Sequence, residues 1–502
     1  MPPTSTQLTL SGLLPTGVER ILRDSNPWWR GERAFGTPPI RRWAFSPTLK
    51  GLRVGLAPIT VLRGPRQVGK TTLLNQVINT LLDDGIDPQR IFRVQFDDIP
   101  QLQKIEAPIL DLAAWYADNV LGKSINAFAN EQRGPVYLLL DEVQNLRDWA
   151  TQIKHLVDLQ PVRAIVTGSS ALRIEAGRDS LAGRIASIEM GPLLLREIGE
   201  IRGFGELNPF LAYNGLAPLK EKSFWQALRQ FGHEHRILRD QAFTAFSEFG
   251  AYPLAHTRPD ASWEEVSSQL VETVVRRAIQ HDLRVGERGR RRDEPLLEEV
   301  FRLACRYVGQ APAQAAYLDE VRRSLDANIG WQRILAYLRF LDATLLIRLV
   351  EPLELRLKRR KGAAKLILSD HSLRAAWLQE QIPLLPSALL AAPHLTDLAG
   401  RVAESAVGQL FKSVIHLAVH HFPERGSEPE VDYVLTIGDQ RIPVEVKYRR
   451  RIDHADSRGL RSFIEKSVYN APFGLMITLG DDVASDDPRI VSIPLSTLLL
   501  MR

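Results

Sequence analysis

Residues 59–78 read ITVLRGPRQVGKTTLLNQVI, and this stretch decides the fold of the amino-terminal part of the chain. Its first five residues are mostly apolar or β-branched and predict a short buried strand, whereas residues 72–78 have the apolar spacing of a helix. Between them lies the pattern G-x-x-x-x-G-K-[ST], whose glycines let backbone N–H groups point at phosphate oxygens. The amino terminus of the helix adds its dipole. Strand, loop and helix together predict a phosphate-binding site.

The loop predicts a site for ATP and Mg²⁺. We expect Lys70 to reach the β- and γ-phosphates and to be catalytic, and the Thr71 hydroxyl to be a Mg²⁺ ligand. The residues expected to contact the nucleotide are the loop and the start of the helix: Gly64, Pro65, Arg66, Gln67, Val68, Gly69, Lys70, Thr71 and Thr72.

Two acids follow a second apolar run. Residues 136–140 are Val-Tyr-Leu-Leu-Leu, as in a strand buried on both faces, and Asp141 and Glu142 come directly after them. Carboxylates at such a strand end indicate a cation nearby. We therefore expect Asp141 to face the Mg²⁺ of ATP and Glu142 to act as the catalytic base that orients water.

Two further polar positions have competing interpretations. The strand-like run 163–167 ends at Thr167, and Ser169 follows; both are either sensors of the γ-phosphate, with Ser169 among the catalytic residues, or caps of a turn. Arg184 precedes another strand-like run, 185–189. It is either an arginine finger that completes the nucleotide site of a neighbouring subunit or a surface charge.

Length and composition exclude several classes of protein. The 502 residues are 44% hydrophobic and 25% charged, which is typical of globular proteins, and the length predicts about three domains. The chain has no apolar run of the roughly 18–20 residues that a membrane span needs, and its start has no pattern of a secretory signal. Cys305 is the only cysteine, so internal disulfides and cysteine-rich metal sites are excluded. We expect a cytoplasmic protein without a membrane partner.

The distribution of the basic residues along the chain is more informative than the net charge. The chain has 64 Lys and Arg against 59 Asp and Glu, a formal charge of +5. Basic residues concentrate near 284–292, 356–361 and 447–451, outside the region of the phosphate loop. Such clusters predict a polyanionic partner, and DNA is the expected one.

Four motifs carry a resemblance to a known family. Residues 63–72, 140–144, 167–170 and 181–184 together resemble the prokaryotic AAA-type ATPases of the archaeal-ATPase-like group. Residues 249–253, Phe-Gly-Ala-Tyr-Pro, resemble the glycine–aromatic–proline element of that family's helical lid, with Ala251 in place of the usual second glycine. The resemblance implies an ATPase with a helical lid, a winged-helix-like middle and a nuclease-like end. We also expect a homo-oligomer, and a hexamer is one arrangement that it could take.

The expected fold class is therefore α/β, a multidomain P-loop AAA-type ATPase. The expected parts are an N-terminal extension at 1–54, the P-loop ATPase core at 55–202, an insertion and helical lid at 203–285, a winged-helix-like domain at 286–385 and a nuclease-like α/β domain at 386–502.

The middle of the chain has the pattern of a winged helix. Helical stretches are expected near 296–308, 314–325 and 331–343, followed by a hairpin of strands at 344–350 and 365–368 with a basic tip. Such a domain either places a helix and its wing on DNA or serves only as a structural scaffold.

The last hundred residues contain a second set of charged groups. A helix at 398–407 carries Glu404, a strand at 430–435 carries Asp432, and the return strand carries Glu445 and Lys447 on one face. This resembles the P-D-(D/E)-x-K nuclease superfamily, in which the acids share Mg²⁺ and the lysine polarises water or the scissile phosphate. The alternative is a DNA-binding scaffold that has lost cleavage.

Three functions follow from these patterns. The first is an ATP-hydrolysing oligomeric motor that remodels or translocates duplex or branched DNA. The second is an ATP-gated, metal-dependent DNA nuclease. The third is a nucleotide-dependent regulatory switch that acts on a protein partner.

Overall fold

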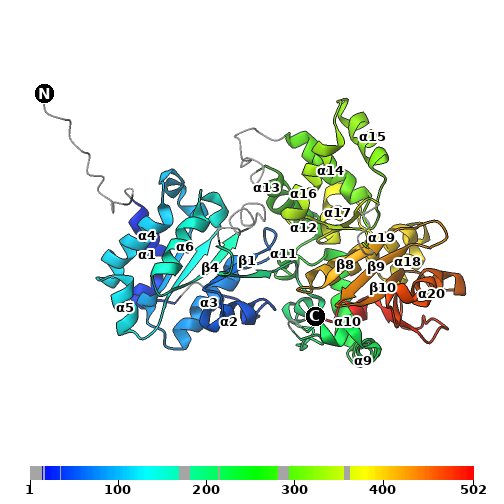
Figure 1. Cartoon of the computed structure of the whole chain (residues 1–502), viewed down its shortest axis with the longest axis horizontal. Helices are drawn as coiled ribbons and strands as arrows, with labels where there is room; N and C mark the ends of the chain where they lie inside the picture. The colour runs from blue at the N-terminus through cyan, green and yellow to red at the C-terminus, as the bar shows by residue number, and fades with distance from the viewer. Residues whose placement is uncertain are drawn as a thin grey trace. The chain divides into compact units, whose positions relative to one another are not determined.

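The computed structural model describes residues 14, 17–33, 36–168, 181–212, 215–280, 293–354 and 362–502. The chain forms two compact units (Figure 1). The first comprises Met1–Pro65 and Gly69–Met190, and the second comprises Arg66–Val68 and Gly191–Arg502.

The first unit is built on a five-stranded parallel sheet. The strand order is β2-β3-β4-β1-β5. The strands are β1 (Ile59–Arg63), β2 (Ile91–Gln95), β3 (Val136–Asp141), β4 (Val162–Gly168) and β5 (Ile185–Glu189). Because all the strands are parallel, the carboxyl ends of β1, β3 and β4 lie side by side at the same end of the sheet. The phosphate loop and the acids predicted from the sequence follow these ends.

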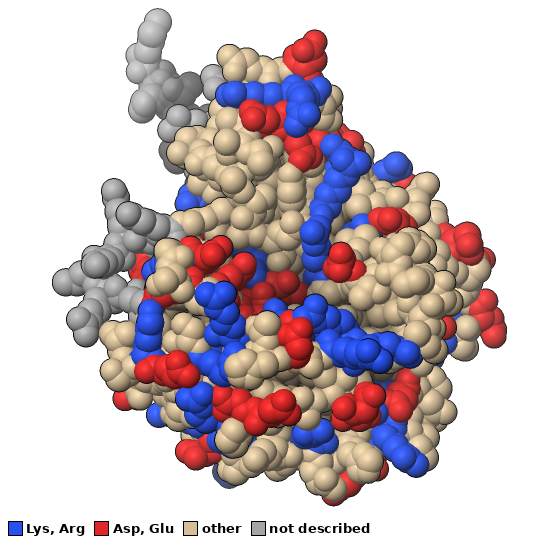
Figure 2. Space-filling model, turned by 90° about the vertical axis from the view of Figure 1, so that its right-hand side faces the viewer, with Lys and Arg blue, Asp and Glu red and all other residues tan. Residues whose placement is uncertain are grey.

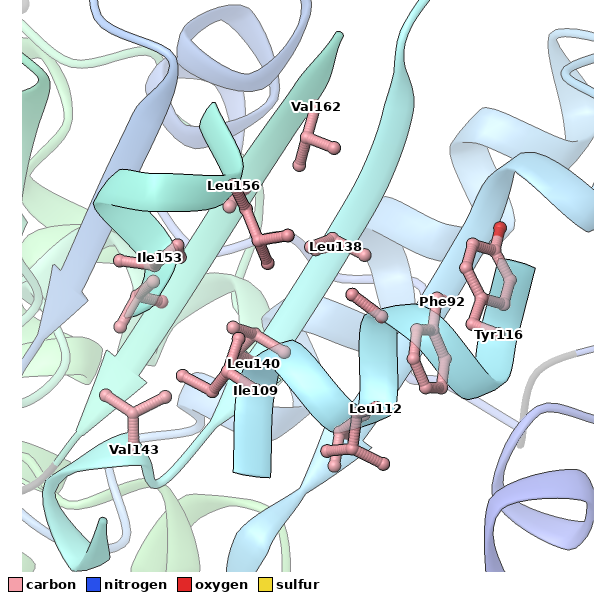
Figure 3. Packing of buried hydrophobic residues seen from close by; sticks show 14 of the residues in the cluster. Phe92, Ile109, Leu112, Tyr116, Leu138, Leu140, Val143, Ile153, Leu156 and Val162 are labelled. Atoms are coloured by element: carbon pink, nitrogen blue, oxygen red, sulfur yellow. The ribbon is translucent and has the colours of Figure 1, made fainter. Parts of the chain in front are cut away.

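Helices cover the sheet of the first unit. They are α2 (Phe45–Val54), α3 (Lys70–Asp83), α4 (Pro108–Tyr116), α5 (Ile125–Glu131) and α6 (Trp149–Leu159). Figure 3 shows Leu138 and Leu140 of β3 packed against Ile109 and Leu112 of α4. Each such buried side chain stabilises the fold by about 1.5–3 kcal/mol relative to an exposed one. This apolar packing holds the site-bearing strands in place.

The N-terminal segment covers the edge strand β2. Its elements are α1 (Val18–Ser25) and the short 3₁₀ helix Pro27–Arg30. Between them Asn26 donates to the Arg93 carbonyl at 2.8 Å and accepts from the Arg93 N–H at 2.7 Å, so its amide pairs with β2 as a neighbouring peptide would. The indoles of Trp28 and Trp29 both donate to the Ile91 carbonyl. The described part of the expected extension is therefore integral to this unit, where it closes an otherwise open sheet edge.

The second unit begins with helices. These are α8 (Leu195–Ile201), α9 (Lys222–Glu234), α10 (Arg236–Phe249), α11 (Pro253–His256), α12 (Trp263–Leu270) and α13 (Arg277–Gln280). Helix α8 lies at the end of the expected ATPase core, packs on α10 and falls in this unit. Gly250, in the glycine–aromatic–proline element, has φ +74°, and a Cβ there would lie 2.2 Å from Asp370 Oδ1. Only glycine fits that turn.

Three helices and a hairpin follow in the order predicted. The helices are α14 (Glu294–Arg306), α15 (Gln314–Leu325) and α16 (Trp331–Ala343). Strands β6 (Ile347–Val350) and β7 (Lys365–Leu368) pair antiparallel, with Arg348 opposite Ile367. The basic runs expected near 284–292 and 356–361 lie outside the described residues. The winged-helix interpretation stays a prediction.

The carboxyl-terminal part has a mixed sheet with the order β12-β11-β10-β9-β8. The strands are β8 (Ala418–Phe422), β9 (Val431–Ile437), β10 (Gln440–Lys447), β11 (Gly474–Thr478) and β12 (Ile490–Pro494). The remaining helices of the chain are α17 (His371–Leu378), α18 (Pro386–Ala391), α19 (Thr396–Ser413), α20 (Arg458–Glu465) and α21 (Leu495–Leu498). Strands β9 and β10 form the predicted hairpin.

Within the described ranges, no helix combines the length and the apolar character that a membrane crossing requires.

Replacing Asn26 with alanine tests the closure of the sheet edge. The Arg93 N–H and carbonyl would lose their partner, and an unsatisfied buried group costs about 1–3 kcal/mol. We expect amide hydrogen exchange in β2 to accelerate about 5- to 150-fold. Mass-spectrometric exchange of peptides spanning 91–95 measures this. Glu19→Ala on the exposed face of α1 is the matched control, and unchanged exchange in the Asn26 variant would contradict the role.

Candidate functional site

The phosphate loop has the backbone that its glycines allow. Gly69 has φ +94°, the left-handed region that favours glycine, and α3 begins at the next residue, Lys70. The Lys70 ammonium is buried and donates to the carbonyls of Gly64 at 3.0 Å and Pro65 at 2.8 Å. The lysine is thus held inside the loop, at the amino terminus of a long helix, where an anion is favoured.

A hydrogen bond joins the loop helix to the acidic strand. The Thr71 hydroxyl, in the first turn of α3, donates to Asp141 Oδ2 at 2.7 Å. The other oxygen of Asp141 accepts from the Thr167 hydroxyl at the end of β4. Strand β4 lies between β1 and β3, the arrangement that the sensor interpretation of Thr167 requires. The structure therefore brings Thr71, Asp141 and Thr167 together.

Asp141 is fully buried, and its environment favours a cation. Burial, assisted by the neighbouring Glu142, raises the pKa of Asp141, while hydrogen bonds from Thr167 and Thr71 and the charge of Arg93 act in the opposite direction. A carboxylate and a hydroxyl that already face each other are the oxygen ligands that Mg²⁺ prefers. The residues present at this edge therefore fit the Mg²⁺ that accompanies ATP.

Glu142 has a strained backbone. Its φ of +58° lies in the left-handed region, which costs a residue other than glycine about 1–3 kcal/mol and is frequent at functional sites. Its side chain accepts a hydrogen bond from Gln144 Nε2. Gln144 was given no role from the sequence, although it is the first polar residue after the acidic pair. It orients the carboxylate for which we predict the role of base.

Arg184 lies at the amino-terminal end of the parallel strands, whereas the phosphate loop of the same chain follows the carboxyl end of β1. It precedes β5, which is parallel to β1, and its carbonyl accepts from the Ile59 N–H at the start of β1. Its Nε lies 2.5 Å from Asp158 Oδ1. A catalytic role for Arg184 would therefore require a neighbouring copy of the chain. Ser169, the other predicted catalytic residue, lies outside the described residues.

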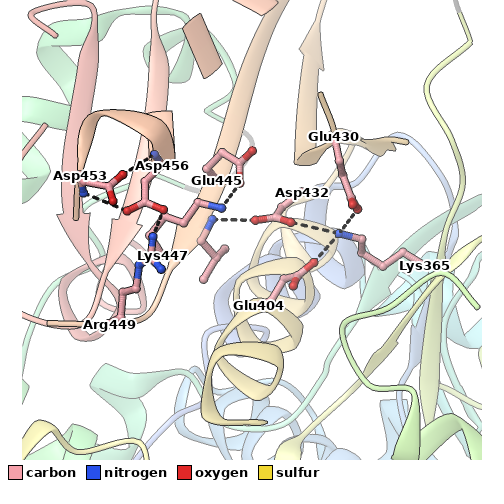
Figure 4. Close-up of polar contacts among 10 residues, drawn as sticks. Lys365, Glu404, Glu430, Asp432, Glu445, Lys447, Arg449, Asp453 and Asp456 are labelled. Atoms are coloured by element: carbon pink, nitrogen blue, oxygen red, sulfur yellow. Dashed lines mark hydrogen bonds and ion pairs between the residues drawn. The ribbon is translucent and has the colours of Figure 1, made fainter. Parts of the chain in front are cut away.

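The second predicted site lies on the expected elements. Glu404 is on α19, Asp432 on β9, and Glu445 and Lys447 on β10 (Figure 4). Lys447 Nζ lies 3.1 Å from Glu445 Oε2. Asp432 Oδ2 accepts from the Val446 N–H at 2.8 Å. The structure thus brings all four side chains into one polar cluster.

A lysine that the sequence did not single out lies among these acids. Lys365, the first residue of β7, is 1% exposed, and its ammonium forms an ion pair with Glu404 (Figure 4). Its Nζ also lies 3.4 Å from Asp432 Oδ1 and 3.6 Å from Glu430 Oε1. A charged residue that opens the otherwise apolar strand Lys-Leu-Ile-Leu was the one signal for it.

The charges in this cluster are strongly coupled. Burial acts to lower the pKa of Lys365, but the carboxylates of Glu404 and Asp432 outweigh it and hold that pKa well above its usual range. Burial and the nearby Asp432 raise the pKa of Glu404 to about 8. Burial also raises the pKa of Glu445, and Asp432 adds to that effect. The surrounding carboxylates therefore favour the charged form of Lys365.

The residues of this second cluster do not fit the Mg²⁺ of a nuclease. The ammonium of Lys365 faces the oxygens of Glu404 and Asp432 that a metal would need. Across the parts of the chain that the structure describes, no group of three or more His, Cys, Asp or Glu side chains is arranged to hold a metal ion.

Three family models match the chain. The AAA domain matches residues 57–199. Two domains of unknown function, DUF8612 and DUF4143, match residues 241–381 and 399–498. The last two matches name no activity for the second unit.

Known proteins share parts of the chain. The uncharacterized protein MJ1637 of Methanocaldococcus jannaschii is 33% identical over 139 residues, which are 28% of this chain and 27% of that protein. The Walker-type ATPase PABY2304 of Pyrococcus abyssi is 16% identical, with a TM-score of 0.38 over 67% of this chain and 95% of that one. The ORC1 protein of Aeropyrum pernix, solved in complex with DNA, is 13% identical, with a TM-score of 0.29 over 68% of this chain and 94% of that one. Because these TM-scores are low, we take no function from the two structures.

The AAA match and the geometry of the loop agree on the first unit. Its parallel α/β sheet, its phosphate loop and the buried Asp141 all lie within the matched residues. The chain therefore contains an AAA-type ATPase domain at residues 57–199.

Proposed function

We propose that this protein is an oligomeric motor that hydrolyses ATP and uses the cycle to remodel or translocate duplex or branched DNA. The observation that carries the ATPase part is the 2.7 Å hydrogen bond between Thr71 and Asp141, which assembles a Mg²⁺ site beside the buried Lys70. Two segments distant in sequence meet there only because the sheet is parallel.

Each residue of the first unit has a distinct task in this proposal. Lys70 and the loop N–H groups bind the phosphates. Thr71 and Asp141 hold Mg²⁺, which supplies charge neutralisation at the transferred phosphate. Glu142, oriented by Gln144, accepts a proton from the attacking water, and Thr167 fixes the position of Asp141. Arg184 links one copy of the chain to the next.

Basic residues of the second unit support a DNA partner. Arg449, Arg450 and Arg451 follow β10 and are exposed, although Arg449 forms an ion pair with Asp456. Figure 2 shows Lys and Arg side chains intermingled with Asp and Glu on the face that it draws. A local basic run such as Arg449–Arg451 contacts phosphates without reading sequence.

The ATP site predicts different losses for two substitutions. Glu142→Gln removes the base and leaves the loop intact, so we expect ATP binding to persist while turnover falls about 10²- to 10⁴-fold. Lys70→Ala removes the cation that holds the phosphates, so nucleotide binding itself should be lost. Steady-state hydrolysis and titration with a fluorescent ATP analogue separate the two effects. Glu131→Gln, on the exposed face of α5, is the control, and normal turnover in Glu142→Gln would rule out its role as base.

The DNA partner predicts a response of the ATPase rate. We expect stimulation by at least one structure in a panel of duplexes, forks and four-way junctions. Charge reversal of Arg450 and Arg451 to glutamate should weaken DNA binding and reduce the salt dependence of log K by about 2, because each lost phosphate contact removes about 0.9.

Arg20→Glu, on the exposed face of α1, is the control charge reversal outside the second unit. If no DNA in the panel changes the rate of ATP hydrolysis, the protein is an ATPase but not a DNA motor.

A further inference from the structure

We propose that the ammonium of Lys365 takes the place of the divalent cation that the nuclease resemblance implies, so that this cluster is a metal-independent ionic joint and not a cleavage site. The proposal concerns the second unit alone and does not depend on the ATPase or on DNA binding.

The first argument is position. The Lys365 ammonium has three N–H donors and faces three carboxylates, those of Glu404, Asp432 and Glu430. Glu404 comes from α19 and the other two from β9 and the residue before it. A Mg²⁺ ion shared by Glu404 and Asp432 would need oxygens at about 2.0–2.1 Å and would occupy the same space.

The second argument is that the surroundings are built for this side chain. The ammonium lies 5.2 Å from the centre of the Tyr433 ring, a cation–π contact. The Tyr433 hydroxyl in turn donates to the Glu404 carbonyl at 2.9 Å. A Cβ at Gly408 would lie 2.5 Å from that hydroxyl, so α19 approaches Tyr433 closely because residue 408 is glycine. The position of Lys365 is therefore fixed by packing as well as by charge.

The third argument is that the acids already have partners within the protein. One oxygen of Asp432 faces Lys365, and the other accepts from the Val446 N–H. Glu445 pairs with Lys447. A metal would have to displace a buried cation and leave it without compensation, and uncompensated buried charges are strongly unfavourable.

The consequence is mechanical. Lys365 belongs to the β6–β7 hairpin, whereas its partners belong to α19 and β9, so the ion pairs join the hairpin to these two elements, which a metal held by the acids alone would not do. The same residues that resemble a nuclease site thereby fix the hairpin to the carboxyl-terminal sheet.

Manganese binding by the nucleotide-free full chain tests the proposal. Mn²⁺ titrations followed by electron paramagnetic resonance should give the same result for the wild type and for the Asp432→Asn variant. Lys365→Ala should gain a Mn²⁺ site at least tenfold tighter than any that the wild type has in this cluster. The double variant Lys365→Ala/Asp432→Asn should lose that site, and Lys365→Arg, which keeps the charge, should not gain it.

Three results would each overturn the proposal. The first is a Mn²⁺ site in the wild type that Asp432→Asn removes. The second is metal-dependent plasmid nicking by the wild type that Asp432→Ala abolishes. The third is a folded Lys365→Ala protein that gains no Mn²⁺ site. If Lys365→Ala does not fold, Mn²⁺ binding by the wild type and by Asp432→Asn still tests the proposal. A Mn²⁺ site that the wild type has and Asp432→Asn lacks contradicts the proposal, and equal binding by the two proteins supports it.

Discussion

The parallel register of the first sheet is the constraint on which the nucleotide site depends. Strand β4 pairs with both β1 and β3, so the ends of all three strands reach the same edge. The hydrogen bond from Thr71 to Asp141 spans 70 positions of sequence and exists only because of that register. Buried strands of this kind form near-continuous apolar runs, which is why the polar residues at their ends stand out.

A second constraint, that buried charges need partners, shapes the carboxyl-terminal cluster. Glu404, Asp432 and Glu445 are carboxyl groups in a largely buried setting, and such groups are neutralised, paired or bound to metal. Here Lys365 and Lys447 supply the cations. The same acids that make the chain resemble a nuclease are therefore satisfied by its own lysines.

Local patterns predicted much of the fold. The strands at 59–63 and 136–141, the loop helix from Lys70, the helices near 296–343 and the hairpin of β9 and β10 all lie where periodicity and turn residues indicated. Each of these depends on neighbours close in sequence, which is the information that periodicity carries. The AAA match at residues 57–199 lies within the expected ATPase core at 55–202, and the helix at the end of that core, α8, packs on α10 in the second unit.

The sequence by itself determined which residues could bind a phosphate and where the acids stand, because loop geometry and strand ends are local properties. Only the tertiary structure decided that Asn26 completes the edge of β2, that Arg184 lies opposite its own loop, and that Lys365 neutralises Glu404 and Asp432. These contacts join residues 26 to 93, 59 to 184 and 365 to 404 or 432. Burial and charge compensation at such distances along the chain arise from packing, and no pattern of neighbouring residues encodes them.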